Sequence, residues 1–327
     1  MKSTLLCYWL VQIMLLARPG WESVMFIFQI KDIFFQSLHP ASILIYPAII
    51  VAGAVALNHP FFLLVLFMAI FSSLAVSGGL GAWLKSVRFF FVLISLFFVI
   101  NTLANRMGST VLLQGPVLPV FGCLTVTLEN LVFVLTMGIR LLIVFTAFIF
   151  YNYTLNPDRA LSFFARFFPR SALLVALTTK SIPYLSQKLQ SVAEIAQCRG
   201  VNFHTGSRLT RIKNLLPLIR VLFISALEDS FNIGESIQAR AYGSGPRTNY
   251  TRERFRPGDF LVTAASVAAL LLIMLSLIRG WGHFSFYPRL GSWVLTRHQV
   301  WTLLGTWLLL MIPALLAWGW NKWNFIR

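Results

Sequence analysis

The sequence predicts an all-α, polytopic membrane protein with about six transmembrane helices and a separate region of long amphipathic helices. The 327-residue chain is 57% hydrophobic and 11% charged, with a mean hydropathy of +0.76. This composition is too apolar for a soluble domain of the same size. Several apolar runs also reach the roughly 17 to 25 residues that a helix needs to cross a bilayer.

Positive charge is concentrated in one part of the chain. The whole chain has 27 Lys and Arg against 10 Asp and Glu, and residues 159–256 hold 15 of the basic residues and five of the acidic ones. In a soluble protein such an excess would suggest nucleic acid, but beside apolar helices it is typical of a cytoplasmic segment. We therefore predict no nucleic-acid partner, and contact between this segment and the anionic headgroups of the lipid bilayer.

Residues 1–40 are expected to form an N-terminal segment at the membrane interface. Their apolar runs, residues 5–17 and 24–30, are shorter than a membrane span. Met1 and Lys2 before the first run resemble the start of a signal peptide, but no clear small-x-small cleavage site follows. We prefer an amphipathic interfacial start.

Residues 41–153 are expected to hold four spans. The first two, at 41–57 and 60–77, are separated by so few residues that they should form a tight hairpin, with His59 as a turn residue rather than a ligand. The third and fourth are expected at 87–104 and 130–152. Between these, residues 105–129 combine Gly, Pro and alternating Val, Leu and Thr, which is typical of an outside loop with a short strand or hairpin.

Arg140 lies near the middle of the fourth predicted span. A charge at this depth is costly unless it is paired or faces protein, so a functional role is one interpretation. The other is an inward structural arginine that binds backbone carbonyls or a buried Asn. We favour the structural interpretation, and both remain open at this point.

Residues 154–258 are expected to form a cytoplasmic region that begins with a short helix. Asn156 is a typical N-cap, Pro157 suits the first helical position because it lacks an N–H, and Asp158 falls in the first turn. The helix that follows, up to about Phe168, is too short and too basic to cross a membrane. It should lie at the inner face.

Two longer helical patterns follow in the same region, and each ends in an arginine beside small residues. The first is expected to begin near Pro183 and ends in Ala196, Cys198, Arg199 and Gly200. The second runs from about residue 214 and ends in Ala239, Arg240, Ala241 and Gly243.

Two interpretations of these arginines are open. A cation in a last turn complements the helix dipole, and a glycine after it is ordinary capping. The repetition favours a second interpretation, in which two exposed guanidinium groups meet carboxylates on a partner.

Residues 259–327 are expected to form a C-terminal hairpin with spans at 260–278 and 299–320. Six spans would place both chain ends and residues 154–258 in the cytoplasm. Three arginines in the last loop, Arg279, Arg289 and Arg297, oppose this orientation. The larger basic excess in residues 159–256 outweighs them.

Motifs for several classes of site are missing from the sequence. There is no G-x-x-x-x-G-K-[ST] phosphate loop, so we do not expect the chain to hydrolyse ATP by itself. The five His and three Cys do not have the spacing of a metal site, and the spans hold no paired carboxylates for a proton-driven carrier. We predict no catalytic residue, no cofactor and no metal.

The paired arginine endings resemble those of the transmembrane T component of energy-coupling factor (ECF) transporters, a branch of the ABC importers that takes up vitamins and transition-metal ions. In that family each motif, usually Ala-Arg-Gly, ends a coupling helix. The segments Leu38–Pro40 and Asn156–Leu161 are also similar, and the resemblance covers about residues 38–260. Two small residues depart from the pattern. Cys198 replaces the first Ala, and Ala241 replaces the second Gly, which puts a tight turn at residue 241 in doubt.

The resemblance implies a non-catalytic coupling subunit in the cell membrane of a prokaryote, joined to two ABC-type ATPase subunits and a substrate-binding integral membrane subunit. The residues that it implies for ATPase binding are Ala196, Cys198, Arg199, Gly200, Ala239, Arg240, Ala241 and Gly243. It leaves four structural or coupling candidates, Arg140, Asn156, Pro157 and Asp158. The alternative is a polytopic membrane enzyme that acts on an anionic lipid or phosphorylated substrate.

Overall fold

Two compact units make up the described part of the protein in this computed structural model. The described residues are 34–104, 110–118, 122–201, 208–245, 255–287, 290–291 and 293–322. We call Leu161–Arg252 the inserted unit, and the described parts of Phe28–Ala160 and Glu253–Arg327 the membrane unit. Most of the predicted interfacial segment, residues 1–33, lies outside the described residues.

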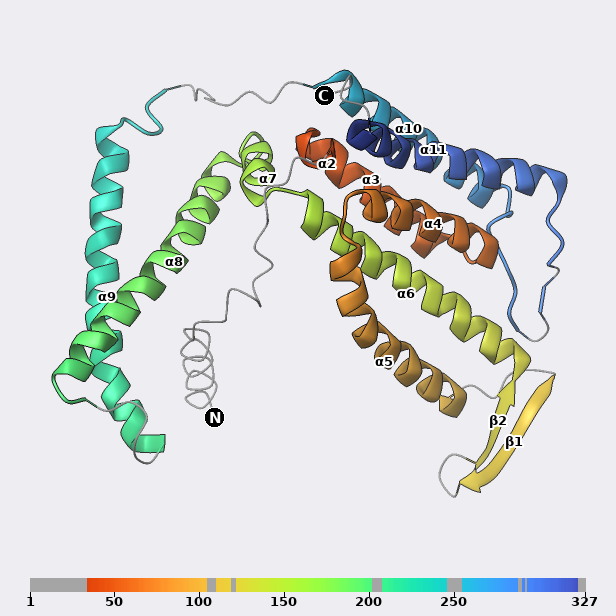
Figure 1. Ribbon diagram of the computed structural model, residues 1–327, viewed down its shortest axis with the longest axis horizontal. Coiled ribbons are helices and arrows are strands. Elements are labelled where there is room, and N and C mark those ends of the chain that lie inside the picture. Colours follow the sequence, from red (N-terminus) through yellow and green to blue (C-terminus); the bar gives the residue numbers. More distant parts are fainter. Residues whose placement is uncertain are drawn as a thin grey trace. The chain divides into compact units, whose positions relative to one another are not determined.

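Six apolar helices form most of the described membrane unit (Figure 1). They are α3 (Pro40–Ala56), α4 (Pro60–Val76), α5 (Leu80–Ala104), α6 (Leu128–Thr154), α10 (Pro257–Ile278) and α11 (Arg297–Lys322). The last four are long and apolar enough to cross a membrane. Helices α3 and α4, of 17 residues each, are at the short end of the spanning range. The predicted all-α polytopic fold is confirmed.

The third span begins earlier in the chain than the sequence predicts. Helix α5 begins at Leu80 rather than near residue 87, and it continues through Lys85 and Arg88. Both side chains are exposed, and long basic side chains at the end of an apolar helix can keep their charge in the polar layer. The early turn is also anchored, because Trp83 Nε1 donates a hydrogen bond to Thr146 Oγ1 of α6 at 3.1 Å.

The predicted hairpin between α5 and α6 is present. Strands β1 (Val111–Leu118) and β2 (Gly122–Thr127) pair antiparallel, and the ladder has two irregularities in register. Thr127 ends the ladder and caps α6, because its hydroxyl accepts from the backbone N–H of Asn130. The hairpin therefore leads directly into the fourth apolar helix.

A buried tyrosine ties three helices of the membrane unit together. The Tyr46 hydroxyl on α3 lies 2.8 Å from Ser73 Oγ on α4, and 3.1 Å from the Leu310 carbonyl oxygen on α11. Buried polar groups of this kind are stable only when paired, so the contacts fix how the helices pack. Helix α3 packs closely on α10 at Gly53, where a Cβ would lie 3.0 Å from Ile273 Cδ1 and would require that side chain to shift.

The turn between α3 and α4 is held by the chain that follows α10. The backbone N–H groups of Asn58 and His59 both donate to the Gly282 carbonyl oxygen, at 2.9 and 3.1 Å. His59 precedes α4, is buried, and packs its ring against Phe62 and Phe284. Its position is that of a packed turn residue.

The remaining helices are α2 (Phe34–Ser37), α7 (Pro157–Phe164), α8 (Pro169–Cys198) and α9 (Arg208–Ala239). Helices α8 and α9 form most of the described inserted unit. The prediction that α8 begins near Pro183 is wrong, because Pro183 lies inside the helix. A proline in a helix interior removes one backbone hydrogen bond and favours a kink. The many remaining bonds of a 30-residue helix keep α8 continuous.

Candidate functional site

Helix α7 begins with the capping arrangement that the sequence predicts. Asn156 Oδ1 accepts a hydrogen bond from the backbone N–H of Asp158 at 3.0 Å, and the Asn156 carbonyl accepts from Ala160 at 3.0 Å. Pro157 occupies the first helical position. A side-chain oxygen thus satisfies one of the N–H groups that the first turn leaves without a partner.

Helices α8 and α9 expose large apolar side chains. Leu174, Ile182 and Ile195 on α8 are more than half exposed, as are Phe223, Ile224 and Phe231 on α9. Exposed apolar surface of this extent is typical of a face that contacts another protein or a membrane. The contact between α8 and α9 therefore leaves many of their apolar side chains exposed.

The end of α8 is a left-handed turn that starts at Arg199. The Gly200 N–H donates to the Gln197 carbonyl at 2.9 Å, the Val201 N–H donates to the Ala196 carbonyl at 3.1 Å, and Gly200 has a φ of 84°. This pair of hydrogen bonds defines a Schellman motif, in which the residue after the C-cap adopts positive φ. Arg199 is the C-cap residue of α8.

The end of α9 repeats this arrangement. The Ala241 N–H donates to the Gln238 carbonyl at 2.8 Å, and the Tyr242 N–H donates to the Ile237 carbonyl at 3.2 Å. Ala241 has a φ of 54°, which alanine adopts only at a steric cost because its Cβ approaches the backbone. The tight turn that the missing glycine put in doubt is therefore present, and Arg240 occupies the same C-cap position as Arg199.

Both arginines point into open surroundings within the described residues. Arg199 and Arg240 are exposed, and so are the small residues beside them, Cys198, Gly200, Ala239, Ala241 and Gly243; Ala196 is partly buried. Across the part of the chain that the structure describes, neither guanidinium has a side-chain hydrogen bond or an ion pair. A small residue next to each arginine allows a partner surface to approach closely.

The C-terminal ends of α8 and α9 lie at opposite ends of the helix pair (Figure 1). The two helices contact one another and run in roughly opposite directions (Figure 1). As a result, the two arginine motifs are held apart instead of forming one basic cluster. The helix pair therefore presents two separate arginine ends.

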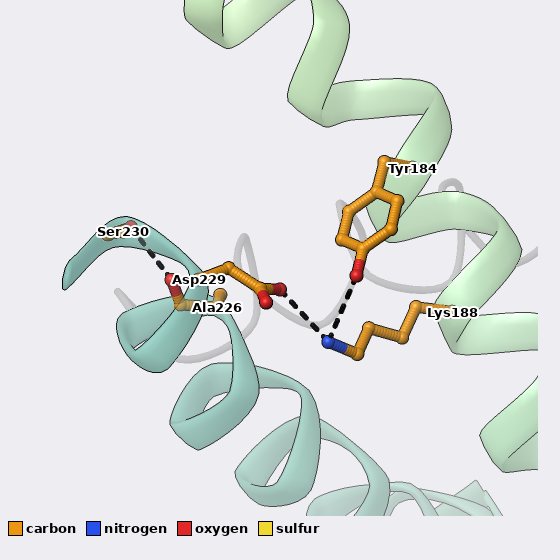
Figure 2. Close-up of polar contacts among 5 residues, drawn as sticks. All are labelled: Tyr184, Lys188, Ala226, Asp229 and Ser230. Atoms are coloured by element: carbon orange, nitrogen blue, oxygen red, sulfur yellow. Dashed lines mark hydrogen bonds and ion pairs between the residues drawn. The ribbon is translucent and has the colours of Figure 1, made fainter. Parts of the chain in front are cut away.

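A salt bridge joins α8 to α9 (Figure 2). Lys188 Nζ lies 2.9 Å from Asp229 Oδ2 and donates a longer hydrogen bond of 3.4 Å to the Tyr184 hydroxyl. The hydrogen bond to Asp229 raises the pKa of the Lys188 amine above its ordinary value. The side chains are 27% and 33% exposed, so water and salt weaken the pair, and its main effect is to orient the two helices.

Arg140 binds the turn between α3 and α4. Its Nη2 donates to the Leu57 carbonyl oxygen at 2.8 Å and to Asn58 Oδ1 at 2.7 Å, and Nη1 lies 3.3 Å from Met137 Sδ. These partners, a backbone carbonyl and an Asn, are those of the structural interpretation. The charge in the middle of α6 thus fastens the hairpin of the first two apolar helices.

Groups of three or more His, Cys, Asp or Glu that could hold a metal ion do not occur among the described residues. Asp229 pairs with Lys188, and Glu129 accepts from the Thr110 backbone N–H and hydroxyl. Both carboxylates therefore have structural partners.

Comparison with known proteins places the chain in a family. Residues 34–250, about two thirds of the chain, match the CbiQ family, described as cobalt transport protein. The chain belongs to this family. The match includes all of α2 to α9 and both arginine motifs, and it ends before α10 and α11.

Individual relatives agree with the family. The chain is 26% identical over 175 residues to the energy-coupling factor transporter transmembrane protein EcfT of Ruminiclostridium cellulolyticum, covering 50% of this chain and 66% of that protein. It is 24% identical to EcfT of Acidaminococcus fermentans, over 62% and 75% of the two chains. A match at 24% identity also covers 59% of this chain and 25% of a putative ABC transporter ATP-binding protein of Bifidobacterium longum. The chain covers less than two thirds of the length of some relatives. It covers 66% of EcfT of Ruminiclostridium cellulolyticum and 39% of EcfT of Brevibacillus brevis.

The sequence located the two arginine motifs and the cap at Asn156, but it missed the long-range contacts. Lys188 and Asp229 are 41 positions apart, and their pairing depends on how α8 crosses α9. Another missed residue is Asp259, which is fully buried at the start of α10. Its signal was present, since an acid two residues after Pro257 is typical of a first helical turn.

Proposed function

We propose that this chain is the energy-coupling transmembrane subunit of an ECF-type ABC importer. Its apolar helices would hold a substrate-binding integral membrane subunit, and the inserted unit would dock on two ABC-type ATPase subunits in the cytoplasm of a prokaryote. The chain itself would be non-catalytic. Hydrolysis of ATP by the partners would move α8 and α9, and that movement would drive uptake of a vitamin or a transition-metal ion.

The observation that carries this proposal is the pair of matched arginine ends on α8 and α9. Each presents an exposed guanidinium at a helix C-cap, with small residues beside it, and the two ends are separated by the helix pair. A planar guanidinium binds a carboxylate with two parallel hydrogen bonds, so each end suits an acidic group in a groove of a partner. The apolar faces of the same helices supply contact area for helix-in-groove docking.

The relatives support the same assignment. Those named EcfT are transmembrane proteins of energy-coupling factor transporters, and a further relative is named as an ATP-binding protein of an ABC transporter. The basic composition of residues 159–256 supports a cytoplasmic location for the inserted unit. The membrane-enzyme alternative has no comparable support in the family.

The test is copurification from native membranes. Tagged wild-type chain, purified in mild detergent, should carry ABC-type ATPases that mass spectrometry identifies, together with a second integral membrane protein. The Arg199→Ala/Arg240→Ala variant should lose the ATPases and keep the membrane protein. Arg220→Ala, an exposed arginine in the interior of α9, is the matched control and should keep both. Recovery of the ATPases with the double variant would reject the docking role.

A further inference from the structure

The chain leaves the membrane unit after Ala160 and returns to it at Glu253. At these two crossings the inserted unit continues along the chain into the described part of the membrane unit. One short segment, Phe34–His39, contacts the chain near both of them. It comprises α2 and the two residues that lead into α3, and we call it the linking segment.

The departing chain is tied to the middle of the linking segment. Arg159 Nη1, in the first half of α7, donates a hydrogen bond to the Gln36 carbonyl oxygen. In the opposite direction, Gln36 Nε2 donates to the Tyr153 carbonyl oxygen, near the end of α6, at 3.3 Å. Phe35 is buried beside these groups and packs edge-on against Phe150 at 5.0 Å. The end of α6 thus contacts Phe35 and Gln36 of α2, and the start of α7 contacts Gln36.

The returning chain is tied to the end of the linking segment through Asp259. This carboxylate is fully buried, and each of its two oxygens accepts a backbone hydrogen bond at the start of a different helix. Oδ2 accepts a hydrogen bond from the backbone N–H of Arg256, the N-cap residue of α10, at 2.8 Å. Oδ1 accepts a hydrogen bond from the backbone N–H of His39, the N-cap residue of α3, at 2.6 Å. The His39 ring also packs against the Phe255 ring in a tilted arrangement, with centroids 4.5 Å apart.

Two further contacts close this arrangement. A Cβ on Gly258 would lie 3.6 Å from the Phe34 ring, so the start of α10 passes directly against α2. The Phe34 ring packs against Trp320 of α11 at 5.6 Å. A carboxylate shared by two helix N-termini is favoured by both helix dipoles, and a buried N–H that loses its acceptor is costly. The linking segment therefore holds α3, α6, α10 and α11 in one arrangement.

We propose that the linking segment, with Arg159 and Asp259 as positioning residues, is the joint that transmits movement of the inserted unit to the membrane helices. A displacement that reaches residue 159 or residue 255 is shared through α2, so α3, α6 and α10 move as one body instead of separately. This inference extends the proposed function and rests on it where transport is concerned. The joint itself is a property of the described contacts and is testable without partners.

The first experiment measures backbone hydrogen exchange in the purified chain in nanodiscs. Asp259→Asn preserves size but turns an NH₂ group towards one of the two backbone donors. The joint predicts faster exchange, by about tenfold, in peptides covering 34–41, 255–262 and also 157–164. Glu129→Gln is the matched control, a buried carboxylate at the start of α6 that accepts from Thr110. An effect of Asp259→Asn confined to 255–262 and 34–41, with 157–164 unchanged, would overturn the joint.

The second experiment measures uptake per ATP hydrolysed by the assembled transporter. Asp259→Asn and Arg159→Ala should keep the ATPases bound and active while uptake per ATP falls about tenfold, and Arg159→Lys should restore most of it because the donor returns. If these residues have only a structural role, the variants should form fewer assembled transporters while uptake per ATP hydrolysed stays unchanged. That result would overturn the proposal. If wild-type chain binds no ATPase, the proposed function fails, and the exchange result alone decides the joint.

Discussion

Among the described residues, three helices end in the same backbone motif with an arginine at the C-cap, yet they differ in their surroundings. At the end of α10, Gly280 has a φ of 71°, and its N–H and that of Trp281 bond back to Leu277 and Ser276 as at α8 and α9. There the Arg279 guanidinium lies over the Trp281 ring at 5.9 Å. The arginines of α8 and α9 have no such side-chain partner among the described residues.

All three arginines occupy a helix C-cap, so the helix-capping interpretation applies to each of them, and the docking interpretation stays a prediction for α8 and α9. An Arg-Gly ending by itself is ordinary helix capping. It becomes a candidate docking point where the guanidinium is free of internal partners and the helix exposes an apolar face. Helices α8 and α9 meet both conditions. Helix α10 also exposes apolar side chains, such as Leu271 and Ile278, but its Arg279 has an internal partner in Trp281.

The largest effect that would sharpen this comparison is on transport. Removing one member of a buried charge pair costs about 2–5 kcal/mol, so Arg199→Ala or Arg240→Ala alone should lower uptake at least about tenfold, and the double variant more. Arg279→Ala, with the same backbone motif, should leave uptake within about twofold because an exposed cation–π contact contributes little. Equal losses in all three single variants would show that the motif acts through capping alone.

Lysine substitutions refine the same point. Lys keeps the charge but lacks the planar fork that binds a carboxylate through two hydrogen bonds. Arg199→Lys and Arg240→Lys should therefore recover only part of the uptake that the alanine variants lose. Transport assays on vesicles with matched protein levels measure this, and full recovery would mean that charge alone is sufficient.

A smaller effect concerns the strained turn after α9. Ala241 adopts a positive φ that costs an L-residue about 1–2 kcal/mol, so Ala241→Gly should stabilise the turn by about 1 kcal/mol. Ala239→Gly, two residues earlier and still helical, should destabilise by about the same amount. Exchange rates of the backbone N–H groups at the end of α9 would report both. A slower rate in Ala239→Gly than in Ala241→Gly would contradict the assigned backbone geometry.

The smallest effect is expected at the salt bridge between α8 and α9. Asp229→Asn should change uptake by less than about threefold, because partly exposed ion pairs contribute little. The raised pKa of Lys188 means that the contribution of the pair is fully present below the ordinary lysine pKa of 10.5. It is lost only as pH rises through the higher pKa of the folded state. A double-mutant cycle with Lys188→Met should thus give the same coupling at about pH 6 and pH 9, and a clear pH dependence in that range would contradict the pairing.

Local patterns predicted much of the fold. The apolar helices, the hairpin at 105–129 and the Asn156 cap follow from run length, alternation and cap chemistry, which act over a few residues. The start of α8 did not, because Pro183 fits a first turn as well as a tolerated kink, and only the neighbouring structure decides between them. The start of α5 was missed for a related reason, since Lys85 and Arg88 interrupt the apolar run without ending the helix.

The contacts that hold the candidate site together could not be predicted in the same way. Arg140 with Asn58, Lys188 with Asp229, and His39 with Asp259 are separated by 82, 41 and 220 positions. Each pairing depends on which helices become neighbours, and a single sequence carries no signal for that. The sequence supplied the chemical groups, and the packing of the helices determined their partners.

The most direct test of the docking account is site-specific photocrosslinking in native membranes. A benzophenone amino acid is placed at one position at a time. The two test positions are Cys198, beside Arg199, and Tyr242, two residues after Arg240. The matched control position is Trp281, two residues after Arg279. The account predicts that the first two positions crosslink to ABC-type ATPase subunits and that position 281 does not. Crosslinks to lipid or to the membrane partner alone at positions 198 and 242 would contradict it.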